Sequence, residues 1–275
     1  MGDTYTHGHH ASVLRSHEWR TAENSAGYLL PHLQSGQRLL DVGCGPGTIT
    51  VDLARRVAPG PVLGIDAGAD VIERAQRAAA SAHTDEISGE GEPLDVRFAT
   101  GDVYDLDLPD GSFDVVHAHQ VLQHLTDPVA ALTEMRRVLA PGGTLAVRDS
   151  DYGGFVWAPE NERLSRWNEL YHQVTARNGA DADAGRHLPA WVRAAGYADI
   201  RISTATWTFA DPESRAWWGG LWADRVEQSA FAEQAVAYGL SDEAELASLA
   251  DGWHAWAAEP DGFFAVLHAE VLAAR

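Results

Sequence analysis

Glycines and acidic residues at the ends of three short apolar runs are the residues of this sequence best suited to binding a ligand. The first run leads into Gly43-Cys44-Gly45, the second ends at Asp66, and the third is followed by Gly101-Asp102. Closely spaced glycines let a backbone turn sharply, and they let a ligand approach without interference from a Cβ atom. Asp66 can accept hydrogen bonds from ribose hydroxyls, and Asp102 can accept one from an adenine amino group.

The same three positions lack the groups that bind phosphate. None of them carries a basic residue, and the glycine segment lacks the Lys-Ser or Lys-Thr pair of a P-loop. The pattern therefore indicates a nucleoside without a pyrophosphate. An NAD-dependent oxidoreductase is an alternative, but Thr48 stands where the third glycine of a dinucleotide-binding motif would let the helix pack.

The elements that must position these residues alternate between strands and helices. We expect strands at 38–42, 62–65, 96–99, 113–117 and 144–148, and helices at 48–57, 69–82 and 128–139. Such a succession is typical of a parallel sheet with right-handed crossovers. Ligands bind these sheets at the carboxyl ends of the strands, so the glycines and the two acids should meet at one edge.

The chain divides into three expected parts. Residues 1–36 form N-terminal helices and a lid, residues 37–150 form the ligand-binding core, and residues 151–275 add helical cap insertions and the last strands. Helices are expected at 11–33, 152–195 and 214–257, strands at 200–209 and 263–272, and a solvated loop at 83–94. We expect the two later helical stretches to cover the carboxyl edge of the sheet.

The motifs of the core resemble those of a known family. Asp41-Val42-Gly43-Cys44-Gly45-Pro46-Gly47 resembles motif I of the class I S-adenosylmethionine-dependent methyltransferases, and later motifs follow in order at Asp66, Gly101-Asp102-Val103, Phe113-Asp114-Val115-Val116 and Leu139-Ala140-Pro141-Gly142-Gly143-Thr144-Leu145. Val121-Leu122-Gln123-His124-Leu125 is similar to the ubiquinone/menaquinone C-methyltransferase-like group. The resemblance covers residues 37–149. It implies an α/β fold with a doubly wound, mostly parallel seven-stranded sheet, helical caps and a final antiparallel strand.

The resemblance also implies S-adenosyl-L-methionine as cofactor and assigns its contacts by position. Gly43 and Gly45 would approach the methionyl part, Asp66 and Ala67 the ribose, Asp102 and Val103 the adenine, and Ala118 and His119 the sulfonium. If the N-terminal segment forms a lid, Arg20 is a candidate to bind the methionyl carboxylate. Asp41 either braces the glycine segment or touches the ligand. Asp114 is expected to be an acid at a strand edge.

The implied reaction is transfer of the sulfonium methyl group, by in-line displacement, to a small-molecule acceptor such as a metabolite or natural product. An enzyme can accelerate it chiefly by holding the acceptor about 3–3.5 Å from the methyl carbon. If a base is needed, His119 is the first candidate, since histidine titrates near neutrality. Asp151 and Tyr152 are the second candidates, whereas His117 and His124 are expected to pack structurally. A non-catalytic S-adenosylmethionine-binding protein is the other alternative.

Two further features suggest walls for the site. In similar enzymes an N-terminal segment closes over the ligands, and here Tyr5, His9, Arg15 and Arg20 are candidates for that lid. The histidines at 7, 9 and 10 lack the Cys or acidic partners of a clear metal site, so no metal is expected. Tryptophans recur at near-helical spacing at 217, 218, 222, 253 and 256. They indicate either core packing or an aromatic pocket for a planar, apolar or cationic acceptor.

Composition excludes several classes of partner. The formal net charge is −20 and the sequence has no lysine, so nucleic acids and anionic membranes are disfavoured. Cys44 is the single cysteine, which rules out an internal disulfide and an arsenic site built from several thiolates. No apolar stretch is long enough for a membrane span or a secretory signal. A cytoplasmic location is therefore expected, and a homodimer is left open.

Overall fold

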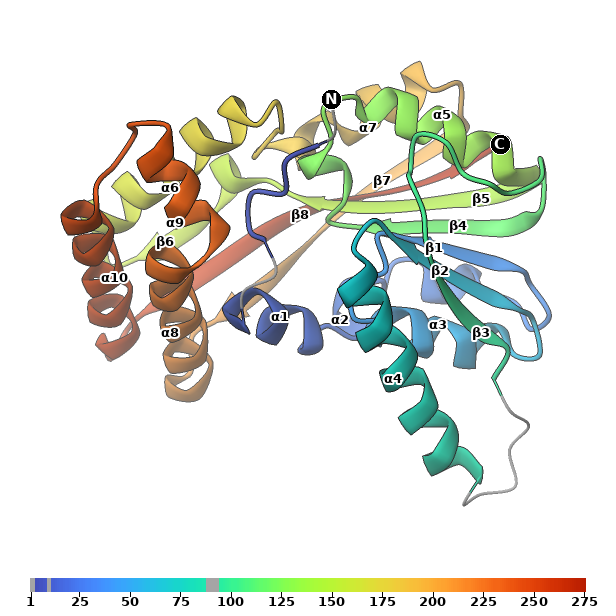
Figure 1. Ribbon diagram of the computed structural model, residues 1–275, viewed down its shortest axis with the longest axis horizontal. Coiled ribbons are helices and arrows are strands. Elements are labelled where there is room, and N and C mark those ends of the chain that lie inside the picture. The colour runs from blue at the N-terminus through green and yellow to red at the C-terminus, as the bar shows by residue number, and fades with distance from the viewer. Residues whose placement is uncertain (1–2, 9–10, 88–93) are drawn as a thin grey trace.

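The computed structural model describes residues 3–8, 11–87 and 94–275. Its described residues form one sheet of eight strands. The strands are β1 (Leu39–Val42), β2 (Val62–Asp66), β3 (Val96–Thr100), β4 (Phe113–His119), β5 (Leu139–Ser150), β6 (Val156–Ala158), β7 (Ala198–Phe209) and β8 (Phe263–Ala274). Figure 1 shows the twisted sheet running across the molecule.

The sheet confirms the expected fold class. Its order is β3-β2-β1-β4-β5-β8, and the first five of these strands are parallel. The last strand, β8, runs antiparallel to β5, and β6 and β7 both pair with it in antiparallel fashion. The expected count of seven strands was one too low, because β6 has only three residues and lies within the segment 152–195 that was predicted to be largely helical.

Helices cover both faces of the sheet (Figure 1). One face carries α5 (Pro128–Val138) and α7 (Ala184–Ala194), and the other carries α2 (Ala22–Ser25), α3 (Thr48–Val57) and α4 (Ala69–Ile87). Alternate residues of β1 serve the two faces: Leu40 packs with α5, whereas Leu39 packs with α3. This alternation follows from the two-residue period of a strand, and it seals a core on each side of the sheet.

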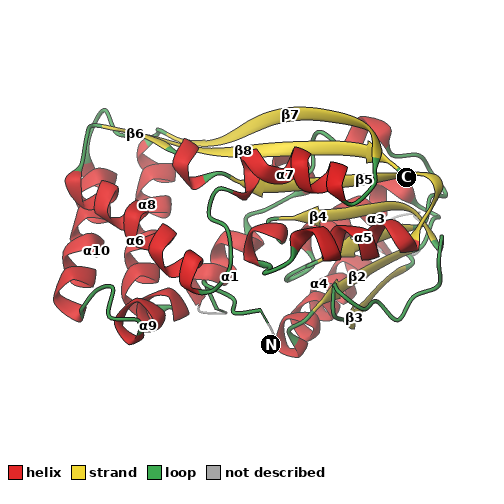
Figure 2. Ribbon diagram, turned by 90° about the horizontal axis from the view of Figure 1, so that it is seen from above, coloured by secondary structure: helices red, strands yellow, loops and turns green. Residues whose placement is uncertain are grey.

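A second group of helices lies beyond the carboxyl ends of the parallel strands, as expected for a cap. It comprises α6 (Glu162–Arg177), α8 (Pro212–Gln228), α9 (Ala230–Ala237) and α10 (Glu243–Ala258). Figure 2 shows these helices gathered at one end of the molecule, against β6 and the beginning of β8. Helix α8 begins where Asp211 accepts hydrogen bonds from the backbone N–H groups of residues 213 and 214 and Pro212 takes the first position, two features that favour a helix start.

Several boundaries differ from expectation. Helix α4 continues to Ile87, so the first part of the expected loop at 83–94 is helical, and residues 88–93 lie outside the described part. The stretch 11–33, where one or two helices are expected, holds α1 (Ala11–Glu18), α2 and the short turn η1 (Leu30–His32). Two further single turns, η2 (Leu122–His124) and η3 (Tyr152–Gly154), follow β4 and β5. Within the described residues, no helix is long and apolar enough to span a membrane.

Candidate active site

The glycine segment, residues 43–47, forms the turn between β1 and α3. Gly43, Gly45 and Gly47 have φ values of 66°, 55° and 84°, a left-handed conformation that L side chains rarely adopt. A Cβ atom on Gly43 would lie 2.3 Å from Val121, so that position also lacks room for a side chain. At Gly45 the nearest atom to such a Cβ is 3.7 Å away. The backbone of Gly45 is therefore open to an approaching ligand.

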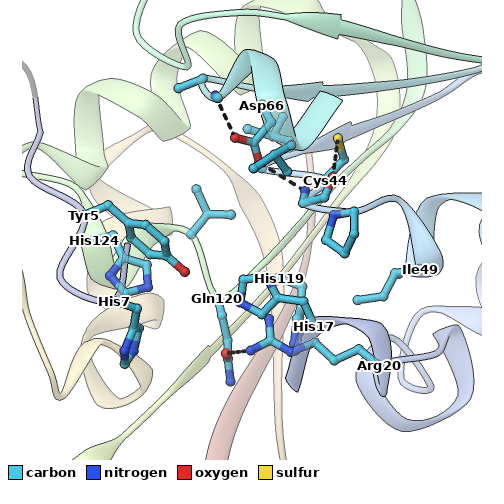
Figure 3. Close-up of a pocket in the computed structure, with 18 of the residues that line it drawn as sticks. Tyr5, His7, His17, Arg20, Cys44, Ile49, Asp66, His119, Gln120 and His124 are labelled. Atoms are coloured by element: carbon cyan, nitrogen blue, oxygen red, sulfur yellow. Dashed lines mark hydrogen bonds between the residues drawn. The ribbon is translucent and has the colours of Figure 1, made fainter. Parts of the chain in front are cut away.

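Asp66 ties the glycine segment to the end of β2. Its Oδ2 accepts a hydrogen bond from the backbone N–H of Gly45 at 3.0 Å, and its Oδ1 accepts one from Gly68 at 3.0 Å (Figure 3). The carboxylate remains half-buried at the wall of a cavity. Asp102 stands at the end of β3 and accepts from the backbone N–H of Tyr104 at 2.9 Å. The two acids thus lie on one cavity, as the order of the strands predicted.

A buried network braces the glycine segment from below. Asp41 Oδ1 lies 2.7 Å from His117 Nδ1, and Thr50 Oγ1 donates to Asp41 Oδ2 at 2.5 Å. These contacts join β1, β4 and α3 just beneath the turn. His117 is fully buried, which agrees with the expected core histidine, and the contacts of Asp41 favour the bracing role. Asp114 forms an ion pair with Arg38 at the edge of β4, and that hydrogen bond lowers the pKa of Asp114.

The cavity above the glycine segment has a volume of about 820 Å³, which lies in the upper part of the usual range for ligand pockets. The predicted residues that line it are Arg20, Gly43, Gly45, Asp66, Ala67, Asp102, Val103, His119 and Tyr152. We call the part around the glycine segment, Asp66 and Asp102 the donor half. The opposite wall is made by Tyr152, Phe155, Trp207, Trp218 and Trp222, and we call it the aromatic half.

Two predicted site residues do not reach the cavity. Ala118 has no exposed surface and packs in the core on the α5 side of the sheet, because it precedes His119 on β4 and points the opposite way. Asp151 is buried and accepts hydrogen bonds from the Nε, Nη2 and backbone N–H of Arg186 on α7. This carboxylate is committed to joining β5 and α7, so the expectation that it contacts substrate was wrong.

His119 and Arg20 lie between the two halves. Both ring nitrogens of His119 are buried without a hydrogen-bond partner, and desolvation together with the charges of Arg20 and Arg148 holds the pKa of His119 well below its usual range. The imidazole is therefore neutral at physiological pH. Arg20 Nη2 donates to Gln120 Oε1 at 2.7 Å, while its Nε has no partner. Burial lowers the pKa of Arg20 to about 10, at which the group is still charged.

The N-terminal segment closes one side of the cavity. Tyr5 and His7 line it, and Figure 3 shows both beside His124. The segment is held from several sides: Asp3 Oδ1 accepts from the backbone N–H of Thr126 at 2.9 Å, and His7 Nε2 lies 2.9 Å from the Tyr171 hydroxyl. Of the other lid candidates, Arg15 forms an exposed ion pair with Asp224, Arg20 lines the cavity, and His9 lies outside the described residues.

The tryptophans serve both of the roles considered. Trp218 and Trp222 of α8 and Trp207 of β7 line the aromatic half, whereas Trp253 and Trp256 are buried in the core of the cap. Periodicity alone could not separate the two groups, because it does not show whether a buried face meets other helices or a cavity.

Sequence reasoning did not predict several wall residues. They include His7, Gln120, Phe155, Trp207 and Arg225, and His124, expected to pack structurally, packs against Tyr5 and also lines the cavity. Arg225 follows Trp222 by three positions, which places both on one side of the helix, and this spacing was the available signal. His7 and Trp207 are distant in sequence from the motifs, and no sequence signal pointed to either of them. Across the described residues, no group of His, Cys, Asp and Glu is arranged to hold a metal ion.

The donor half fits S-adenosylmethionine. Gly45 leaves its backbone open, two carboxylates stand at neighbouring strand ends, and the charged side chain of Arg20 lines the same cavity. These groups match a nucleoside joined to a zwitterionic amino acid, without a phosphate. The parallel sheet with a reversed last strand, combined with this donor half, defines the class I S-adenosylmethionine-dependent methyltransferases.

Comparison with known proteins leads to the same class. A family model described as a methyltransferase domain matches residues 33–198, and the chain belongs to this family. It is an S-adenosylmethionine-dependent methyltransferase. It is 34% identical over 274 residues to the uncharacterized methyltransferase C1B3.06c of Schizosaccharomyces pombe, covering 98% of this chain and 95% of that one. It is 33% identical over 287 residues to the probable methyltransferase ltbC of Aspergillus luteorubrus, covering 98% and 97%.

Solved structures support the fold. The YcgJ protein from Bacillus subtilis superposes with a TM-score of 0.56 at 17% identity, covering 90% of this chain and 97% of that one. The finer likeness to the ubiquinone/menaquinone C-methyltransferase-like group does not follow from these comparisons and stays a prediction.

Proposed function

We propose that this enzyme methylates a small-molecule acceptor held in the aromatic half of the cavity. The observation that carries the proposal is that the donor half and the aromatic half belong to one continuous cavity, with His119 between them. A volume of about 820 Å³ leaves room for an acceptor beside the donor, given that single ligands occupy pockets of roughly 300–1,000 Å³. The N-terminal segment and the cap close this space in a way that suits a metabolite better than a macromolecule.

Two relatives with more specific names support an oxygen atom as the methyl acceptor. The O-methyltransferase rstn1 of Aspergillus nomiae is 34% identical over 154 residues, 55% of this chain and 63% of its own. The 27-O-demethylrifamycin SV methyltransferase of Amycolatopsis mediterranei is 35% identical over 176 residues, 63% of this chain and 59% of its own. Both matches are partial, and the particular acceptors of those two enzymes are not assigned to this protein.

Binding of the donor is assigned to the residues of the donor half. Asp66 would accept hydrogen bonds from the ribose hydroxyls and Asp102 one from the adenine amino group, with Ala67 and Val103 beside them. The backbone of Gly43 and the open backbone of Gly45 would follow the methionyl part. Arg20 would pair with the methionyl carboxylate, because its buried Nε lacks any other partner. When bound, S-adenosylmethionine supplies a methyl group activated by its sulfonium.

His119 and Tyr152 are the residues proposed to orient the acceptor. The neutral imidazole of His119 can accept a hydrogen bond from a hydroxyl of the methyl acceptor. Its lowered pKa makes it a weak general base. Burial raises the pKa of Tyr152 to about 12, so its hydroxyl stays protonated and can donate. Aromatic walls exclude water and fix the plane of the acceptor, which is where positioning contributes to the rate.

The proposal is tested by combining donor binding with product detection. Calorimetry with S-adenosylhomocysteine should show binding, and methyl-labelled S-adenosylmethionine incubated with a panel of phenols and aromatic acids should label at least one of them. His119→Ala should reduce that labelling without loss of donor binding, whereas the exposed Asp107→Ala should change neither. Binding without labelling of any acceptor would support the non-catalytic alternative, and absence of binding would overturn the assignment of the donor half. The cytoplasmic location and the homodimer stay predictions.

A further inference from the structure

Arg225 places a buried positive charge on the aromatic half of the cavity. It belongs to α8, its exposed fraction is 4%, and its guanidinium carbon lies 4.5 Å from the centroid of the Trp222 ring. Its Nη2 donates to Ser16 Oγ at 3.0 Å and to the backbone oxygen of Ser12 at 3.3 Å. Its Nε is buried without a partner, and the side chain lines the cavity. Two neutral acceptors on α1 therefore satisfy only part of this guanidinium.

No carboxylate of the described residues forms an ion pair with Arg225. Among the residues that the structure describes, no acid lies within 4.0 Å of either Arg20 or Arg225. The nearest acid along α8, Asp224, is paired with Arg15 on the exposed side of the helix. Among the other buried arginines of the described residues, Arg148 differs, since its Nε lies 3.4 Å from Glu270 Oε1, whereas Arg215 also pairs with no acid but does not line the cavity.

The electrostatic surroundings agree with the geometry. Burial is the largest cause of the lowered pKa of Arg225, and the groups that oppose it are the neutral phenols Tyr152, Tyr5 and Tyr171. Burial also lowers the pKa of Arg20, and the charge of Arg225 lowers it further. A buried cation with no counter-charge is costly for a protein to maintain. A ligand that brings negative charge into the cavity would remove that cost at both positions.

The two arginines have different neighbours in the cavity. Arg20 is hydrogen-bonded to Gln120, directly after β4, and its guanidinium carbon lies 5.5 Å from the centroid of the Trp207 ring; it is the residue expected to bind the methionyl carboxylate. Arg225 stacks on Trp222 and faces the phenols of the aromatic half. One donor carboxylate can compensate one of these charges, and the other charge is left for the acceptor.

We propose that the acceptor is a planar aromatic compound that binds as an anion, with its carboxylate or ionised hydroxyl paired to Arg225 and its ring packed against Trp218 and Trp222. This inference deepens the proposed function and rests on it. It reverses one expectation from the sequence, in which the aromatic wall also suited a cation. Two guanidinium groups without a carboxylate between them would repel a cationic acceptor, and a cation–π contact on Trp222 is already taken by Arg225.

The test measures charge preference with simple probes in the presence of saturating S-adenosylhomocysteine. Calorimetry would compare benzoate, 4-nitrophenolate, the neutral benzamide and the cationic benzyltrimethylammonium. We expect the better of the two anions to bind at least about tenfold more tightly than benzamide, equivalent to about 1.4 kcal/mol, and the cation to bind most weakly. Benzoate and 4-nitrophenolate then distinguish a carboxylate from an ionised hydroxyl as the preferred group.

Variants assign the preference to one residue. Arg225→Gln should reduce the preference for anions to less than about threefold and leave the Kd for S-adenosylhomocysteine nearly unchanged, while Arg225→Lys should keep part of it. Arg20→Gln should have the opposite effects: it should weaken the binding of S-adenosylhomocysteine and leave the preference for anions over benzamide unchanged. Arg215→Gln is the matched control, since Arg215 is a buried arginine of the same helix that does not line the cavity.

The outcomes separate this inference from the proposed function. An anion preference that survives Arg225→Gln, or tightest binding by benzyltrimethylammonium, would overturn the inference while donor binding stands. If S-adenosylhomocysteine itself fails to bind the wild-type protein, the proposed donor half is wrong instead. If Arg225→Gln does not fold, Arg225→Lys takes its place in the test. Equal affinities of this variant for the anions and for benzamide would then count against the inference.

Discussion

Replacing Asp66 by alanine removes the carboxylate that joins the glycine segment to β2 and that is proposed to bind the ribose. In the free protein this carboxylate accepts two backbone hydrogen bonds at 3.0 Å. Hydrogen bonds to a charged group contribute about 1.5–3 kcal/mol each to stability. Because Asp66 is half-exposed, we expect each of its two hydrogen bonds to contribute an amount near or below the lower limit of that range. We therefore expect a loss of about 2 kcal/mol in unfolding free energy, which lowers Tm by about 4–8 °C.

Asp66→Ala is also expected to weaken binding of the donor. At least one charge-assisted hydrogen bond to a ribose hydroxyl disappears, and the turn at Gly45 loses its anchor. A loss of about 1.4–3 kcal/mol corresponds to a tenfold to roughly hundredfold rise in the Kd for S-adenosylhomocysteine. Asp66→Asn keeps one acceptor oxygen and should fall between wild type and Asp66→Ala.

Calorimetry well below the Tm of the variant separates binding from folding. Circular dichroism would establish that Asp66→Ala is folded at the temperature used. Asp107→Ala is the matched control, because it removes the same charge from an exposed position outside the cavity, and its Kd should equal that of the wild type. A folded Asp66→Ala protein with an unchanged Kd would refute the placement of the ribose at this strand end.

Three more predictions concern the lid, the aromatic wall and a buried acid. Deleting residues 1–8 removes Tyr5 and His7 from the cavity wall and should raise the KM of donor or acceptor by about tenfold or more; unchanged kinetics would exclude a lid. Trp222→Phe should leave the Kd for S-adenosylhomocysteine unchanged but lower kcat/KM, whereas Trp253→Phe, in the cap core, should affect only the free energy of unfolding; equal effects of both on kcat/KM would contradict a role for Trp222 in the site. Burial raises the pKa of Asp149 to about 8, so the folded protein retains a proton that the unfolded chain has lost above about pH 4. On account of this group, stability should fall by about 1.4 kcal/mol per pH unit up to about pH 8, and Asp149→Asn should remove that slope in urea unfolding; parallel pH profiles for the two proteins would disprove it.

The sequence by itself determined the parallel core and the donor half. Apolar runs alternating with helices specify parallel strands, and residues directly after such strands meet at one edge because parallel strands end there together. Gly43, Gly45, Asp66 and Asp102 could therefore be placed without knowledge of distant contacts. Their geometry depends on short stretches of chain, in which local conformation and spacing carry most of the information.

Only the tertiary structure decided which distant side chains complete the cavity. His7, Trp207 and Arg225 come from an N-terminal segment, the β7 strand and a cap helix, and packing of the cap brings them to one wall. The structure also excluded Ala118, on the opposite face of β4 from His119, and Asp151, which is held by Arg186. Side-chain direction at a strand end and the choice of an ion-pair partner depend on contacts between segments far apart in the chain, and those contacts exist only once the chain is folded.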